Sequence, residues 1–260
     1  METEVLRKFD AAVEAKQSIL CLGLDPDPST YVSREDKLGF CLKIIKTVAE
    51  NVSAVKVNEN FVRDLSVEDH VHITSLAREN GLLTVYDCKM GDIENTNRAG
   101  LQLVKRMGYD LVTFNPVLGN LQDAVRDAAG FGVGVLALLH PSNPASRKYY
   151  RAVLEDGRRL YELFLEDVCA SGAEGVVLGL HPELAPEEIA SIRARLGEEK
   201  IILFPGFGVQ GGDPRTAVKH GGRRILVNVG RTILSSPNPK QTAAELSKQL
   251  NELRRIFPVE

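Results

Sequence analysis

The sequence contains few cysteines, no long apolar run and no excess of positive charge, and each of these absences excludes a class of protein. The four cysteines show no CxxC or Cys/His ligand spacing, so we expect no zinc site and a reduced, cytoplasmic compartment. Nowhere do about 18 apolar residues follow one another, and the charged residues 1–17 lack the apolar stretch of a signal peptide, so no membrane partner is expected. Lys and Arg number 32 against 35 Asp and Glu, and the net charge of −3 argues against a nucleic-acid partner.

Common metal and nucleotide motifs are also missing. His70 and His72 lie two residues apart in an expected helix and therefore point to different faces. No HExxH motif and no carboxylate/His ligand spacing occurs, so no metal is predicted. Neither GxxxxGK(S/T) nor GxGxxG follows an expected strand, so a phosphate ligand of this chain should be a monophosphate.

What the chain does contain is a regular alternation of short apolar runs and helical patterns. Hydrophobic residues make up 43% of the 260 residues, enough for a sizeable core. Helical spacing is found at 34–52, 66–80 and 146–172, and no low-complexity linker divides the chain. Eight such units in about 250 residues are typical of a (β/α)8 TIM barrel, which we predict as a single domain over 1–260, with a doubly wound open sheet as the alternative. The expected strands are residues 18–25, 53–58, 82–89, 110–115, 132–139, 175–180, 200–206 and 224–230.

Charged residues gather where the expected strands end, which in a barrel is where chemistry takes place. Asp87 and Lys89 are two apart in a strand and should point to the same side, and Lys56 ends the neighbouring strand. Asp92, in the following loop, balances the second lysine. A network of two lysines and two aspartates would keep a lysine protonated in a dry pocket, where it can donate a proton. The alternative is an ion-pair network that only stabilises the barrel mouth.

A second candidate site follows the last two expected strands. Four glycines lie within residues 206–212, ahead of Asp213 and Pro214 at an expected helix start. Such glycines let backbone N–H groups approach an anion, and Arg231 after Gly230 offers a fork-shaped cation for phosphate oxygens. The pattern predicts a phosphate site, although glycines in tight turns would produce the same pattern.

These motifs together resemble the orotidine 5′-phosphate decarboxylase family along nearly the whole chain. The most specific match is DCKMGDIENTN (87–97), which is similar to the family signature DxKxxDI-xxT. The other matching segments, in the family's order, are CLGLDPDP (21–28), VKVNENF (55–61), PGFGVQGGDP (205–214) and VGRTI (229–233).

The resemblance implies a homodimeric barrel that converts orotidine 5′-monophosphate (OMP) to uridine 5′-monophosphate (UMP) and carbon dioxide in de novo pyrimidine biosynthesis, with no metal or organic cofactor. By the resemblance, Lys89 protonates C6 of the pyrimidine and Asp87 lies near the substrate carboxylate. Lys56 and Asp25 bind ribose hydroxyls. Asp92 and Thr96 are contributed to the active site of the partner subunit.

The resemblance also assigns the two ends of the substrate. Gln210, Gly230 and Arg231 take the phosphate, and the loop 206–212 is the expected lid. Ser142, in LLHPSNP (138–144), is the candidate contact to the pyrimidine edge, although a serine before Asn-Pro is also common in plain turns.

Two other functions stay open at this point. A magnesium-dependent decarboxylase or aldolase acting on a keto-gulonate or hexulose phosphate has a similar DxKxxD, but a cation at Lys56 suits the lysine–aspartate network better than a metal site. A catalytically idle phosphosugar-binding barrel is the second alternative, but such a protein would have no need for all four charges.

Overall fold

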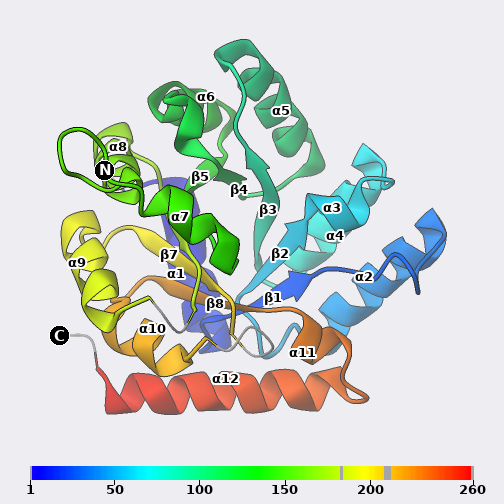
Figure 1. The fold of residues 1–260 in the computed structure, drawn as a ribbon. Coiled ribbons are helices and arrows are strands. Elements are labelled where there is room, and N and C mark those ends of the chain that lie inside the picture. The colour runs from blue at the N-terminus through cyan, green and yellow to red at the C-terminus, as the bar shows by residue number, and fades with distance from the viewer. Residues whose placement is uncertain (1, 182–183, 208–211, 259–260) are drawn as a thin grey trace.

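Eight parallel strands close into a barrel in the computed structural model, which describes residues 2–181, 184–207 and 212–258 (Figure 1). Each strand pairs with the next one in the chain, and β8 pairs with β1, which closes the ring. The predicted (β/α)8 barrel is therefore confirmed, and the open sheet is not found. The strands are β1 (Leu20–Leu24), β2 (Ala54–Asn58), β3 (Leu83–Met90), β4 (Leu111–Phe114), β5 (Gly134–His140), β6 (Gly175–Leu178), β7 (Ile201–Pro205) and β8 (Ile225–Val229).

Helices follow the strands and surround the barrel (Figure 1). Several begin at a side-chain cap: Ser33 accepts from the backbone N–H of Asp36, and Asp213 caps a helix whose first residue is Pro214, as predicted. The helices are α1 (Glu4–Lys16), α2 (Arg34–Val48), α3 (Glu59–Val62), α4 (Val67–Glu79), α5 (Glu94–Met107), α6 (Leu121–Phe131), α7 (Arg147–Tyr150), α8 (Leu160–Ser171), α9 (Pro186–Leu196), α10 (Pro214–His220), α11 (Arg231–Leu234) and α12 (Pro239–Ile256), with 3₁₀ turns η1 (Pro116–Leu118) and η2 (Pro144–Ser146).

The continuous helical pattern expected over 146–172 is wrong in its middle part. The structure places the short α7 and the longer α8 there, separated by a turn. Within this turn Gly157 adopts φ +84°, a conformation outside the helical region, and the backbone N–H of Leu154 donates to the carbonyl of Arg158 at 2.7 Å. The apolar spacing continued across this turn and so concealed it.

The barrel interior is apolar and closed at the N-terminal end of the strands. Phe9 of α1 packs there against inward-facing residues such as Leu83, Leu136 and Leu226. A second core lies between the strands and the outer helices. Because one end of the barrel is filled, the space for a ligand lies at the C-terminal end of the strands. No helix in the described ranges combines the length and apolar character needed to cross a membrane.

Candidate active site

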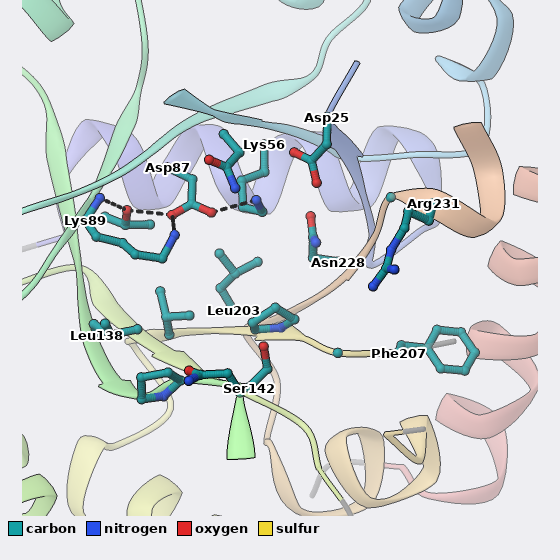
Figure 2. A pocket seen from close by; sticks show the side chains of 18 of the residues that line it. Asp25, Lys56, Asp87, Lys89, Leu138, Ser142, Leu203, Phe207, Asn228 and Arg231 are labelled. Atoms are coloured by element: carbon teal, nitrogen blue, oxygen red, sulfur yellow. Dashed lines mark hydrogen bonds and ion pairs between the residues drawn. The ribbon is translucent and has the colours of Figure 1, made fainter. Parts of the chain in front are cut away.

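A cavity of about 230 Å³ opens at the C-terminal end of the strands (Figure 2). All eight strands, or the residues directly after them, contribute to it, together with the segments after β5 and β7. Most of the predicted site residues come together in it, although they are distant in sequence. Those that line it are Asp25, Lys56, Asp87, Lys89, Ser142, Gly230 and Arg231.

A chain of alternating charges crosses the cavity. Lys56 Nζ lies 2.7 Å from Asp87 Oδ2, and Lys89 Nζ lies 2.8 Å from Asp87 Oδ1 (Figure 2). The side chain of Lys56 is 6% exposed and that of Asp87 is 11% exposed, whereas Lys89 is 45% exposed toward the cavity. The central carboxylate therefore holds one buried and one accessible ammonium group.

The charges of Lys56, Asp87 and Lys89 set one another's protonation states. Burial alone would raise the pKa of Asp87, but the ammonium groups of Lys56 and Lys89 outweigh it and hold the pKa well below its ordinary value. Burial alone would lower the pKa of Lys56, but the carboxylates of Asp87 and Asp25 outweigh it and raise the pKa above its ordinary value. Asp87 is thus an anion and Lys56 a cation near neutral pH.

Strand β3 does not run straight through the site. Its pairing with β4 shifts between Tyr86 and Met90, and Lys89 adopts φ +50°, which is uncommon for a residue with a side chain. Asp87 and Lys89 face the same cavity, as their two-residue spacing predicts, but the strand between them is bulged and not regular. Their side chains are in direct contact.

The next part of the cavity contains two buried acceptors. Among the described residues, Asp25 Oδ1 and Asn228 Oδ1 have no hydrogen-bond partner. Burial raises the pKa of Asp25, and the ammonium of Lys56 opposes part of this shift. Figure 2 shows both side chains directed toward the space between Lys56 and Arg231. Two unsatisfied acceptors suit a ligand that carries hydroxyl donors.

The candidate phosphate site lies after β7 and β8, at one end of the cavity. Arg231 begins α11 directly after Gly230, is exposed at the cavity rim, and has no ion-pair partner within the described ranges. Gly206, which also lines the cavity, adopts φ +108°. Gln210 lies outside the described residues, as does most of the expected lid loop 206–212, so its phosphate contact stays a prediction.

Ser142 lines the cavity from the segment after β5 (Figure 2). Its position is set by a close approach to Gly179, where an added Cβ would lie 2.3 Å from the backbone N of Ser142. The neighbouring apolar side chains Leu138, Val177 and Leu203 form the floor between Ser142 and the charges.

Asp92 and Thr96 are placed differently from the rest. Both are exposed and do not line the cavity of their own chain. The loop is held by Asn97, whose Oδ1 accepts from the Asp92 N–H at 2.9 Å and whose Nδ2 donates to the Asp92 carbonyl at 2.6 Å. Asp92 therefore lies on a fixed loop, with its carboxylate at the surface.

The comparison with known proteins agrees with this geometry. Residues 18–246 match the orotidine 5′-phosphate decarboxylase / HUMPS family. The chain belongs to this family. Curated relatives named orotidine 5′-phosphate decarboxylase include those of Azoarcus sp. (strain BH72), 32% identical with 90% of this chain and 91% of the relative covered, and Roseiflexus castenholzii, 32% identical with 95% and 94% covered.

Solved structures of the family share the fold. The Leishmania donovani OMP decarboxylase superposes with a TM-score of 0.78 at 27% identity, covering 95% of this chain and 98% of that one. The orotidine 5′-monophosphate decarboxylase from Methanocaldococcus jannaschii, complexed with the inhibitor BMP, gives a TM-score of 0.72 at 23% identity, covering 89% and 98%.

Thr113 and Asn228 are among the cavity residues that were not predicted from the sequence. Each is a polar residue inside an otherwise apolar strand, in LVTF and ILVNV. That interruption is the signal that could have identified them. No three His, Cys, Asp or Glu side chains converge as metal ligands in the part of the chain that the structure describes.

Proposed function

We propose that the cavity converts OMP to UMP and carbon dioxide, the decarboxylation that forms UMP in pyrimidine biosynthesis, with Lys89 as proton donor to C6. The observation that carries the proposal is the Lys56–Asp87–Lys89 chain, in which one ammonium is buried and the other faces the cavity. Membership of the decarboxylase family across most of the chain supports the same reaction.

The chemistry explains why a fixed cation is needed. When the bond between C6 and the carboxylate breaks, carbon dioxide leaves and the electron pair stays on C6 in the plane of the ring. The π system cannot take up this pair, so a positioned ammonium has to stabilise it. Lys89 then gives one proton to C6, and the resulting amine takes a proton from water. Carbon, charge and protons balance without an electron acceptor.

Asp87 and Lys56 keep that donor in place. Asp87 binds both ammonium groups, so the ammonium of Lys89 is held at the cavity before the substrate arrives. Such preorganisation is effective because the charges need no rearrangement when the carbanion forms. The carboxylate of the substrate would lie near Asp87.

The remaining groups fit the ribose and the phosphate. Asp25 and Lys56 are proposed to bind ribose hydroxyls, with the unpartnered Oδ1 of Asp25 as the acceptor. Gly230 and Arg231 are proposed to bind the phosphate, since the arginine is exposed at the rim. Ser142 is proposed to contact the edge of the base.

We further propose that two copies of this chain form a dimer with shared sites. Asp92 and Thr96 would then complete the cavity of the partner subunit. Exposed apolar side chains support an interface beside this loop: Ile93 is 65% exposed, Val117 56% and Leu118 55%. A cluster of this kind on the surface commonly marks a binding face.

The charges also discriminate against the magnesium-dependent alternative. Both oxygens of Asp87 already accept from ammonium groups, and Lys56 places a buried positive charge where a cation would have to bind. Repulsion between the lysine and a divalent ion would oppose metal binding there. This arrangement favours OMP over an enediolate-forming sugar phosphate.

The proposal is tested by following the absorbance decrease of OMP with purified protein, with and without EDTA. We expect turnover that EDTA does not change. Lys89→Ala should lower kcat by roughly 10³-fold or more, because both the stabilising charge and the proton are lost, while UMP binding is retained. Near-wild-type turnover by Lys89→Ala would refute the proton-donor role. Loss of activity with EDTA would support the metal-dependent alternative, and UMP binding without any OMP turnover by the wild type would indicate a scaffold.

A further inference from the structure

Thr113 of β4 lies opposite the bulge that carries the charged residues. The pairing of β3 with β4 runs from Tyr86 opposite Val112 directly to Met90 opposite Phe114. Thr113 is thus the single β4 residue across from the three residues 87–89 of β3. It is 1% exposed.

The hydrogen bonds of the Thr113 hydroxyl have only one possible direction. The backbone N–H of Lys89 donates to Thr113 Oγ1 at 2.9 Å, so the oxygen accepts there. The hydroxyl hydrogen therefore goes to Asp87 Oδ1 at 2.9 Å, since the ionised carboxylate can only accept. One hydroxyl group thus connects the backbone of one charged residue to the side chain of the other.

The two hydrogen bonds of the Thr113 hydroxyl hold the backbone of Lys89 and the carboxylate of Asp87 in place. Lys89 has φ +50°, a conformation that costs free energy and persists only where the surrounding structure holds it in place. Asp87 Oδ1 also accepts from Lys89 Nζ at 2.8 Å, so its orientation fixes where that ammonium lies. A change at the hydroxyl would shift the backbone and the side-chain anchor of Lys89 together.

We propose that Thr113 is a positioning residue that sets the place of the Lys89 ammonium through Asp87 and the backbone of the bulge. The inference rests on the proposed decarboxylation, in which Lys89 is the donor. Although Thr113 lines the cavity, its hydroxyl is already bonded to protein groups on both sides. Thr113 therefore acts on the donor and not on the affinity for the nucleotide.

The chain offers a matched control on the same pair of strands. Thr84 of β3 is 2% exposed, its Oγ1 accepts from the backbone N–H of Asp110 at 3.1 Å, and it donates to Asp110 Oδ2 at 2.8 Å. Thr84 thus accepts from a backbone N–H and donates to a carboxylate, as Thr113 does. It lies, however, near the N-terminal end of its strand, away from the cavity. Removing the Thr84 hydroxyl therefore measures how much stability is lost when a buried hydroxyl with these hydrogen bonds is removed away from the site.

The experiment compares Thr113→Val, Thr113→Ser and Thr84→Val by kcat and KM for OMP, UMP dissociation constant and melting temperature. We expect Thr113→Val to lower kcat roughly 10- to 100-fold, the worth of a hydrogen bond to a charged group, with UMP binding unchanged. Thr113→Ser should restore kcat to within about threefold, because it keeps the hydroxyl. Thr84→Val should lower the melting temperature but leave kcat unchanged.

Three outcomes of this comparison would overturn the proposal. They are an unchanged kcat in Thr113→Val, weaker UMP binding that accounts for the whole loss of activity, and an equal loss of kcat in Thr84→Val. Wild-type turnover in the same assay separates this result from a failure of the proposed function. Hydrogen exchange at the Lys89 amide adds a readout without turnover: it should accelerate in Thr113→Val and stay protected in Thr84→Val, and continued protection in Thr113→Val would also overturn the proposal.

Discussion

Arg231 differs from most arginines of this chain because no ion pair neutralises its charge in the ranges that the structure describes. Arg224, for comparison, binds Asp10 and the backbone carbonyl of Glu199, whereas Arg231 has no ion-pair partner among the described residues. A guanidinium exposed at the rim of a cavity and left without an anion is available for a ligand's phosphate. Its contribution should therefore depend on whether the substrate carries that phosphate.

Arg231→Ala is expected to lower kcat/KM for OMP roughly 10- to 100-fold, the worth of a charge-assisted hydrogen bond, mainly through KM. For orotidine, which lacks the phosphate, the same substitution should have little effect. Steady-state kinetics with both substrates measures the difference, and Arg255→Ala at the exposed end of α12 is the control. Equal losses for OMP and orotidine would show that Arg231 does not bind the phosphate.

Residues of the site differ in how far the sequence predicts them. Lys56, Asp87 and Lys89 stand out because charge is rare inside apolar strands, and the structure places all three in one cavity. Thr113 and Asn228 each interrupt an apolar strand, but uncharged polar residues are common in strands, so this interruption is a weaker signal than a charge. The left-handed backbone of Lys89 could not be predicted either, because it involves a hydrogen bond that the Lys89 N–H donates to Thr113 on a different strand.

At the scale of elements, the ends of β5 and β6 determine how the Ser142 segment approaches the cavity. The backbone N–H of Gly179 donates to the carbonyl of His140 at 2.6 Å. A Cβ on Gly179 would lie 2.3 Å from the N of Ser142 and 2.7 Å from the carbonyl carbon of Pro141. Both are backbone atoms, so the clash cannot be relieved by a change of rotamer.

Gly179→Ala should therefore displace the Pro141–Ser142 segment, raise KM for OMP and lower stability by about 1–3 kcal/mol, as overpacking does. Gly39→Ala is the matched control, because a Cβ there meets nothing within 4 Å and Gly39 lies within α2. Thermal unfolding and steady-state kinetics measure both effects. If Gly179→Ala keeps the wild-type KM and melting temperature, the segment is not held by this contact.

Strands and helices could be predicted from the sequence where the spacing of apolar residues and the length of the segment indicated the same element. All eight strands lie where the apolar runs placed them, because each run is buried on both faces and has no polar interruption long enough to end it. The failure at 146–172 has the opposite cause. Apolar residues such as Tyr150, Leu154 and Tyr161 keep a helical spacing in the sequence on both sides of Gly157, so periodicity alone could not reveal the turn between α7 and α8.

At the scale of the whole molecule, the two ends of the barrel serve different purposes. Phe9 of α1 closes the N-terminal end, and burial raises the pKa of the Cys21 thiol in that interior to about 12. The C-terminal end is open and carries the charges. On the same side, Asp92 and Ile93 are exposed and do not line the cavity of their own chain. A shared site between two copies accounts for both placements.

Such sharing predicts complementation between two impaired chains. Lys89→Ala and Asp92→Asn should each be strongly impaired alone. A mixed dimer, however, contains one site with the intact Lys89 of one chain and the intact Asp92 of the other. Random pairing makes half of the dimers mixed, with one good site in each, so co-expression should restore about a quarter of the wild-type activity. The measurement is OMP turnover of the purified mixture.

The control for this experiment pairs Lys89→Ala with Lys56→Ala, two residues that line the cavity of their own chain. No arrangement of these chains in a dimer produces an intact site, so no activity should return. Recovery in the first mixture and none in the second requires that Asp92 acts across the interface. If neither mixture recovers although differently tagged chains co-purify, Asp92 serves its own chain and the sites are not shared.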